Sequence, residues 1–134
     1  MNKKVKVIPC SGIGKVYGLI ARESALKTVF DLLPEKSETV CLAYIVTGDK
    51  EAREKIEGFA CITVDGCPKM CASKNVSIAG GNVMEEIKVL DTVKEHKGKK
   101  FGSPTQLDED GELVTDEIAA KIAKTINELN EGGK

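Results

Sequence analysis

The chain has 134 residues, which suits one domain with a single core and leaves no room for two independent cores. Its 20 basic and 21 acidic side chains give a formal net charge of -1, so no strong field draws it to nucleic acid or an anionic membrane. Aromatic residues make up 4%, too few for a base-stacking surface, and no apolar run approaches the roughly 18 residues of a membrane span. The basic start, 1–4, leads into no apolar signal core. We therefore expect one cytoplasmic domain over 1–134 that binds neither nucleic acid nor membrane.

The first half of the chain alternates between strand-like and helical patterns. The β-branched run 5–8 predicts a strand, and apolar residues at three- and four-residue spacing predict a helix over 16–33, closed by Pro34. The nearly all-apolar run 39–46 is typical of a strand buried on both faces, although its second half also suits a helix. A short charged helix is expected over 48–57.

The second half continues the alternation. A strand is expected over 59–64, a helix over 68–79 with proline in its first turn, and a fourth strand over 83–90. The segment 91–114 is expected to form a loop, a hairpin or an irregular excursion. A final amphipathic helix is predicted to begin at Thr115 as its cap.

This alternation predicts a three-layer α/β fold, with a mostly parallel sheet of about four strands and helices on both faces. In such folds the loops that follow the strands gather at one edge of the sheet, where ligands bind. Cys10 follows the first expected strand and Cys67 follows the third, so we expect both at this edge.

The chain contains five cysteines, an odd number that does not suit a disulfide framework in a reducing compartment. Metal binding and thiol chemistry are therefore the first hypotheses to consider. The cysteines are Cys10, Cys41, Cys61, Cys67 and Cys71.

The segment 9–15 (PCSGIGK) departs from three familiar phosphate-binding motifs. A Walker A loop needs glycine in place of Pro9 and serine or threonine in place of Val16. A phosphatase loop needs arginine in place of Val16. A dinucleotide fingerprint needs glycine in place of Tyr17. What remains is a glycine-rich turn into a helix N-terminus. Its free amides would hold an anion or favour the thiolate of Cys10, and the alternative is a tight structural turn.

The segment 65–71 (DGCPKMC) is more specific. A four-residue spacing at a helix start predicts that Cys67 and Cys71 lie on one side of the first turn, as a metal clamp or a dithiol pair. The alternative is two small buried residues. Asp65 is expected to accept from backbone amides in a turn, or else to support a ligand or handle a proton.

The remaining candidates are weaker. Cys61 lies in an apolar run and is expected in the core. Cys41 reaches the ligand edge only if the second strand ends early, around Leu42. His96 lies within a charged stretch and is expected on the surface.

Three segments together resemble the DGC-domain family: CSGIGKV at 10–16, a cysteine followed by Leu-Ala at 41–43, and DGCPKMCA at 65–72. The resemblance runs over 5–90 and, by size, extends to the whole chain. The family is proposed to bind zinc through four cysteines. By position these are Cys10, Cys41, Cys67 and Cys71, with Cys61 outside the set.

Three hypotheses for the function follow. The first is a cytosolic metal-binding module in which the resemblance supplies the four ligands and zinc is inferred, with Cu(I) or an iron–sulfur cluster left open. The second is a sulfur-transfer or redox enzyme that uses Cys67 or Cys10 as nucleophile. The third is an interaction module whose cysteines only pack. A protein partner that receives metal or sulfur fits the first two hypotheses.

Overall fold

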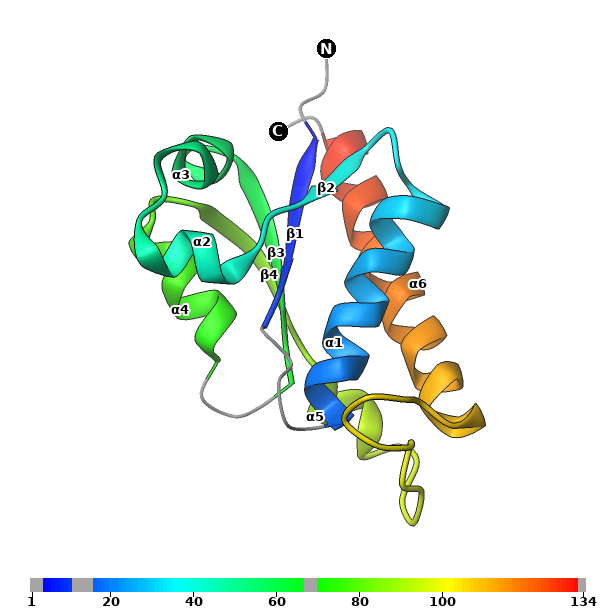
Figure 1. Cartoon of the computed structure of the whole chain (residues 1–134). Helices are drawn as coiled ribbons and strands as arrows, with labels where there is room; N and C mark the ends of the chain where they lie inside the picture. Colours follow the sequence, from blue (N-terminus) through cyan, green and yellow to red (C-terminus); the bar gives the residue numbers. More distant parts are fainter. Residues whose placement is uncertain (1–3, 11–15, 67–69, 133–134) are drawn as a thin grey trace.

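A four-stranded sheet forms the centre of the fold (Figure 1). The computed structural model describes residues 4–10, 16–66 and 70–132. The strands are β1 (Val5–Pro9), β2 (Ser37–Thr39), β3 (Ala60–Asp65) and β4 (Asn82–Lys88). Their order is β2-β1-β3-β4, and all three neighbouring pairs are parallel. The prediction of a parallel sheet of about four strands is confirmed.

Helices cover both faces of this sheet (Figure 1). One face carries α1 (Val16–Lys27), the π-helical turn η1 (Thr28–Leu32), α5 (Val89–Val93) and α6 (Glu109–Gly132). The other carries α2 (Leu42–Thr47), α3 (Lys50–Ile56) and α4 (Cys71–Ile78). Because side chains alternate along a strand, Val7 joins the core under α1 and α6, whereas Ile8 joins the core under α2, α3 and α4. The three-layer α/β architecture is confirmed.

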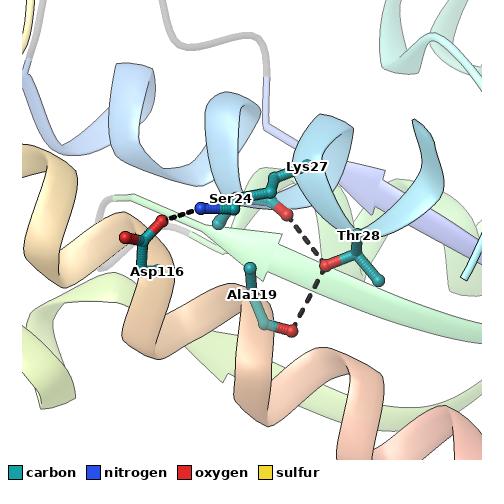
Figure 2. A network of polar contacts seen from close by, with 5 residues as sticks. All are labelled: Ser24, Lys27, Thr28, Asp116 and Ala119. Carbon is teal, nitrogen blue, oxygen red and sulfur yellow. Dashed lines mark hydrogen bonds and ion pairs between the residues drawn. The ribbon is translucent and has the colours of Figure 1, made fainter. Parts of the chain in front are cut away.

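Polar contacts supplement the apolar packing of α1 on α6 (Figure 2). The ammonium group of Lys27 pairs with the carboxylate of Asp116. The Thr28 hydroxyl lies 2.9 Å from the Ser24 carbonyl oxygen and 3.3 Å from that of Ala119 on α6. At this point the helix widens, and the Leu33 amide donates to the carbonyl of Thr28, five residues back, at 2.8 Å. The helix expected over 16–33 therefore ends in a π-helical turn.

The strand expected over 39–46 is wrong beyond its first residue, and the alternative of a helix in its second half is confirmed. Within that run only the first residue, Thr39, belongs to β2, and the chain becomes helical at Leu42. Leu42 and Ile45 are buried while Tyr44 is exposed, the spacing of a helix with one apolar face. Gly48, with φ +80°, ends α2. Cys41 was expected to reach the ligand edge only if the second strand ended early. β2 does end early, at Thr39.

The C-terminal half also differs from expectation. The expected irregular segment 91–114 contains the end of α5 and the first turns of α6, which begins at Glu109 and not at Thr115. Asp108 caps this helix by accepting from the Gly111 amide at 2.8 Å, so Thr115 lies inside α6 and is buried. In the described part of the chain, no helix combines the length and apolarity needed to cross a membrane.

Candidate functional site

The carboxyl ends of β1 and β3 meet at the place where the connections of the sheet diverge. From β1 the chain continues to β2 on one side, whereas from β3 it continues to β4 on the other. Such a switch point opens a crevice beyond the strand ends, the usual binding place of parallel α/β folds. Cys10 follows β1 and Asp65 ends β3, so both predicted residues lie at this point.

Cys10 is held against the turn that follows β3. Its backbone N–H donates to the carbonyl of Val64 at 2.9 Å, which continues the β1–β3 ladder by one residue. The N–H of Gly66 donates to the Cys10 sulfur at 3.3 Å. The side chain is half-buried and packs against both apolar cores. An amide donor directed at sulfur favours the thiolate, the form that binds metals and attacks electrophiles.

Gly66 occupies a position that has no room for a side chain. A Cβ atom there would lie 2.6 Å from the carbonyl oxygen of Tyr17 and 2.7 Å from the amide nitrogen of Gly18. Both are backbone atoms of α1, which cannot move aside without displacing the helix. Glycine therefore allows the turn after β3 to pack on the first turn of α1 while its N–H reaches Cys10.

Asp65 anchors the start of α4. Its carboxylate oxygens accept from the amide of Ala72 at 2.9 Å and from that of Ser73 at 3.2 Å. The residue is 1% exposed, and this burial raises the pKa of its carboxyl group. The hydrogen bonds from the two amides oppose the rise in pKa, whereas the negative charge of Glu86 adds to it. Asp65 accepts backbone amides as expected, but those amides belong to a helix seven and eight residues further along the chain.

Cys71 is the first residue of α4, and its side chain is exposed. Met70 before it has a left-handed backbone with φ 55°, so the helix begins at Cys71. The helix expected over 68–79 therefore begins later than predicted, with Cys71 as its first residue. Its predicted partner Cys67 lies outside the described residues, as does Pro68.

Cys41 lies at the start of α2, where its carbonyl accepts from the amides of Tyr44 and Ile45 at 3.2 and 3.3 Å. Its side chain is exposed. Because α2 packs against α4, the helix that follows Cys41 and the helix that begins at Cys71 belong to the same layer of the fold.

Cys61 is a core residue, as predicted. It is fully buried near the start of β3, and its sulfur lies 3.4 Å from the carbonyl oxygen of Phe59. Loss of hydration raises the pKa of its thiol to about 11, an effect only partly opposed by the Asn82 backbone and the charge of Lys6. A thiol of this kind stays protonated and inert near neutral pH.

His96 is only half-buried and not simply a surface residue. Its Nε2 lies 3.1 and 3.2 Å from the two carboxylate oxygens of Glu117 on α6. Among the described residues, Glu95, His96 and Glu117 are the one group of three metal-capable side chains whose ligand atoms all lie within 4.8 Å of one another. Cys10, Cys41 and Cys71 do not form such a group by themselves, and the fourth predicted ligand is Cys67.

Sequence reasoning missed two polar residues near Asp65. Ser73 is buried, and its hydroxyl donates to the carboxylate of Glu86 on β4. This contact ties the first turn of α4 to the neighbouring strand. No local signal marks it, since serine and glutamate at these positions also suit an exposed helix and an edge strand.

Comparison of the sequence with known proteins assigns the chain to a family. No curated protein and no solved structure matches it. The DGC domain matches it over residues 6–118, a span that includes the predicted ligands Cys10, Cys41, Cys67 and Cys71. The chain is thus a member of the DGC domain family.

Proposed function

We propose that this chain is a cytoplasmic metal-binding protein that holds a soft metal ion through Cys10, Cys41, Cys67 and Cys71. The observation that carries the proposal is the hydrogen bond from the Gly66 amide to the Cys10 sulfur. It brings the cysteine after β1 into direct contact with Gly66, the residue that precedes the predicted ligand Cys67 in the sequence. A contact of this kind is expected where two loops jointly form a binding site at a switch point.

The donor set fits zinc. Thiolates are ligands for Zn²⁺, which takes four of them in a tetrahedron with Zn–S distances of about 2.3 Å. Cu(I) and iron–sulfur clusters share the preference for sulfur, and they remain the alternatives. When bound, the metal would act as a Lewis acid or be carried as cargo. The chain would supply the four thiolates and the amide that donates to one of them.

Two features support metal handling over a purely structural zinc site. The sheet is covered by an apolar core on each face, so the fold has packing that does not depend on a metal staple. In addition, Cys41 and Cys71 are exposed in the described structure. Ligands accessible to solvent suit an ion that is taken up from a donor and passed to a protein acceptor.

The test is the metal and acid-labile sulfide content of protein purified without oxygen or chelators. We expect about one zinc per chain in the wild type, loss of that zinc in Cys67→Ser and Cys71→Ser, and retention in Cys61→Ala. Cys61→Ala is the matched control because it removes a cysteine that lies in the core. Equal metal content in all four proteins contradicts the proposed ligands, and iron with sulfide changes the metal to a cluster.

One observation favours a second candidate function, thiol exchange. The same Gly66 amide would stabilise a Cys10 thiolate for attack on the disulfide of a partner protein. The attack forms a mixed disulfide and releases one partner thiolate. A second cysteine of this chain, such as Cys67, then displaces the other partner thiolate and leaves an internal disulfide. Fast alkylation of Cys10 or Cys67 in metal-free protein near pH 7 is the expected sign, and uniformly slow alkylation contradicts it.

A further inference from the structure

Two consecutive residues, Asp65 and Gly66, contact the surroundings of two separate cysteines. Gly66 bonds to the Cys10 sulfur through its backbone N–H, whereas Asp65 bonds to the first turn of the helix that begins at Cys71. We infer that this pair acts as the positioning element of the proposed metal site, setting where Cys10 and Cys71 lie relative to each other. The inference rests on the proposed function and assigns these residues a role toward its ligands.

The contact on the Cys10 side is rigid. Cys10 is fixed to β3 by its own backbone bond to Val64, and Gly66 is pressed against the backbone of Tyr17 and Gly18. The donor is therefore a backbone N–H in a packed segment, and the sulfur ends a short, half-buried side chain whose backbone is held by β3. The amide reaches the sulfur without rearrangement, as expected of a donor that orients a ligand.

The contact on the Cys71 side is also fixed. The carboxylate of Asp65 leaves the end of β3 and accepts from the two residues that directly follow Cys71. Ser73, one of these two, is tied in turn to Glu86 on β4. The first turn of α4 is thus attached to two neighbouring strands of the sheet. The backbone of Cys71 follows from these attachments, although its side chain remains exposed.

The burial of Asp65 is offset by its hydrogen bonds to the start of α4. Burial of a carboxylate at 1% exposure is unfavourable without compensating hydrogen bonds, and here both bonds go to the start of α4. Cys41 differs, since within the described residues no hydrogen bond connects it to Asp65 or Gly66. We therefore expect changes at Asp65 to act through Cys71 and its neighbours and not through Cys41.

The experiment is a cobalt(II) titration of the full chain, followed by the sulfur-to-cobalt charge-transfer absorption. The variants are Asp65→Ala and Asp65→Asn, and the matched control is Asp108→Ala. Asp108 also caps a helix by accepting from a backbone amide, but that helix is α6, on the opposite face of the sheet from α4. Circular dichroism and urea unfolding report the fold and stability of each protein.

We expect Asp65→Ala to weaken cobalt binding by about 10- to 100-fold, the range found for residues that orient metal ligands. Asp108→Ala should bind within about twofold of the wild type even where its loss of stability is similar. Asp65→Asn should lie between the two, because its side chain keeps one oxygen acceptor. A charge-transfer band that changes shape in the Asp65 variants alone would show altered thiolate placement.

Several outcomes overturn the inference. Equal cobalt affinity in Asp65→Ala and Asp108→Ala would show that Asp65 contributes only stability. Failure of both Asp65 variants to fold would make Asp65 a residue of the fold and not of the site. A wild-type chain that shows no sulfur-to-cobalt absorption would overturn the proposed function itself and this inference with it, a result distinct from the first.

Discussion

Strand β3 has a cysteine near each of its two ends, and the surroundings of these cysteines are opposite in kind. Near its start, Cys61 is enclosed by apolar side chains, and burial raises the pKa of its thiol to about 11. Beyond its end, Cys10 lies next to a backbone N–H that favours the thiolate. The comparison shows that position along the strand decides cysteine chemistry, because only the carboxyl end combines loop amides, a helix start and solvent.

Differential alkylation gives the largest expected effect in this comparison. At pH 8 a thiol with a pKa of about 11 is ionised in about one molecule in a thousand. In metal-free protein we expect iodoacetamide to modify Cys61 at least about 100-fold more slowly than exposed Cys41 and Cys71. Because the thiolate fraction of Cys61 grows tenfold per pH unit below its pKa, its rate should still rise between pH 8 and 10. Peptide mass spectrometry measures each site, and urea-unfolded protein, in which the rates converge, is the control.

Two glycines, Gly66 and Gly81, lie beside the two ends of β3, and their replacement by alanine should lower the free energy of unfolding by different amounts. At Gly66 the new Cβ meets backbone atoms of α1 at 2.6 to 2.7 Å, whereas at Gly81 it meets side-chain atoms of Val76 and Ile56 at similar distances. Side chains rotate more readily than a helix backbone moves. We expect Gly66→Ala to lower the free energy of unfolding by about 3 kcal/mol and Gly81→Ala by about 1 kcal/mol. Urea unfolding measures both, and the reverse order would contradict the rigid contact at Gly66.

Removal of a cysteine sulfur should also affect stability differently at the two ends. Cys61→Ala leaves a small cavity in the core and should cost about 1 kcal/mol. Cys71→Ala changes an exposed side chain at a helix start, so in metal-free protein its effect should stay within about 0.5 kcal/mol. Thermal or urea unfolding of metal-free protein tests both. A larger loss for Cys71→Ala would mean that Cys71 packs in the fold.

A comparably small effect concerns the ion pair beside Cys61, between buried Lys6 on β1 and Glu38 on β2. The hydrogen bond from Lys6 holds the pKa of the Glu38 carboxyl below its usual value, against a smaller opposing effect of burial. A lowered folded pKa contributes stability that is present above the unfolded pKa and is lost as the pH falls through the folded pKa. Because the Glu38 side chain is 34% exposed, we expect Glu38→Gln to cost only about 0.5 to 1 kcal/mol at pH 7.

The pH dependence provides the check on this last prediction. Urea unfolding of wild type and Glu38→Gln at pH 7 and at pH 3 should show the difference shrinking in acid. A difference that grows in acid would show that the carboxylate is not stabilised by Lys6. Ser37→Ala is not a suitable control, because the Ser37 hydroxyl donates to the Leu33 carbonyl at 2.7 Å. Glu35→Gln, at an exposed neighbouring position, is preferable.

The candidate site was predictable from sequence to different extents at each residue. Cys10 and Asp65 follow short β-branched or apolar runs, so their place at the strand ends was predictable. Cys61 lies within an apolar, strand-like run, and this pattern correctly predicted its burial. The start of α2 was harder, because a short apolar run such as 39–46 suits a buried strand and a buried helix equally well.

Sequence patterns predicted the layered α/β class, the core position of Cys61 and the place of Cys10 after the first strand, because each depends on periodicity or order along the chain. Three contacts became visible only in the folded chain: the Gly66 amide meets a sulfur 56 residues away, Asp65 caps α4, and His96 meets Glu117. These contacts join separate segments through the packing of helices on the sheet. A local pattern carries no information about which distant backbone group will fill the space beside it.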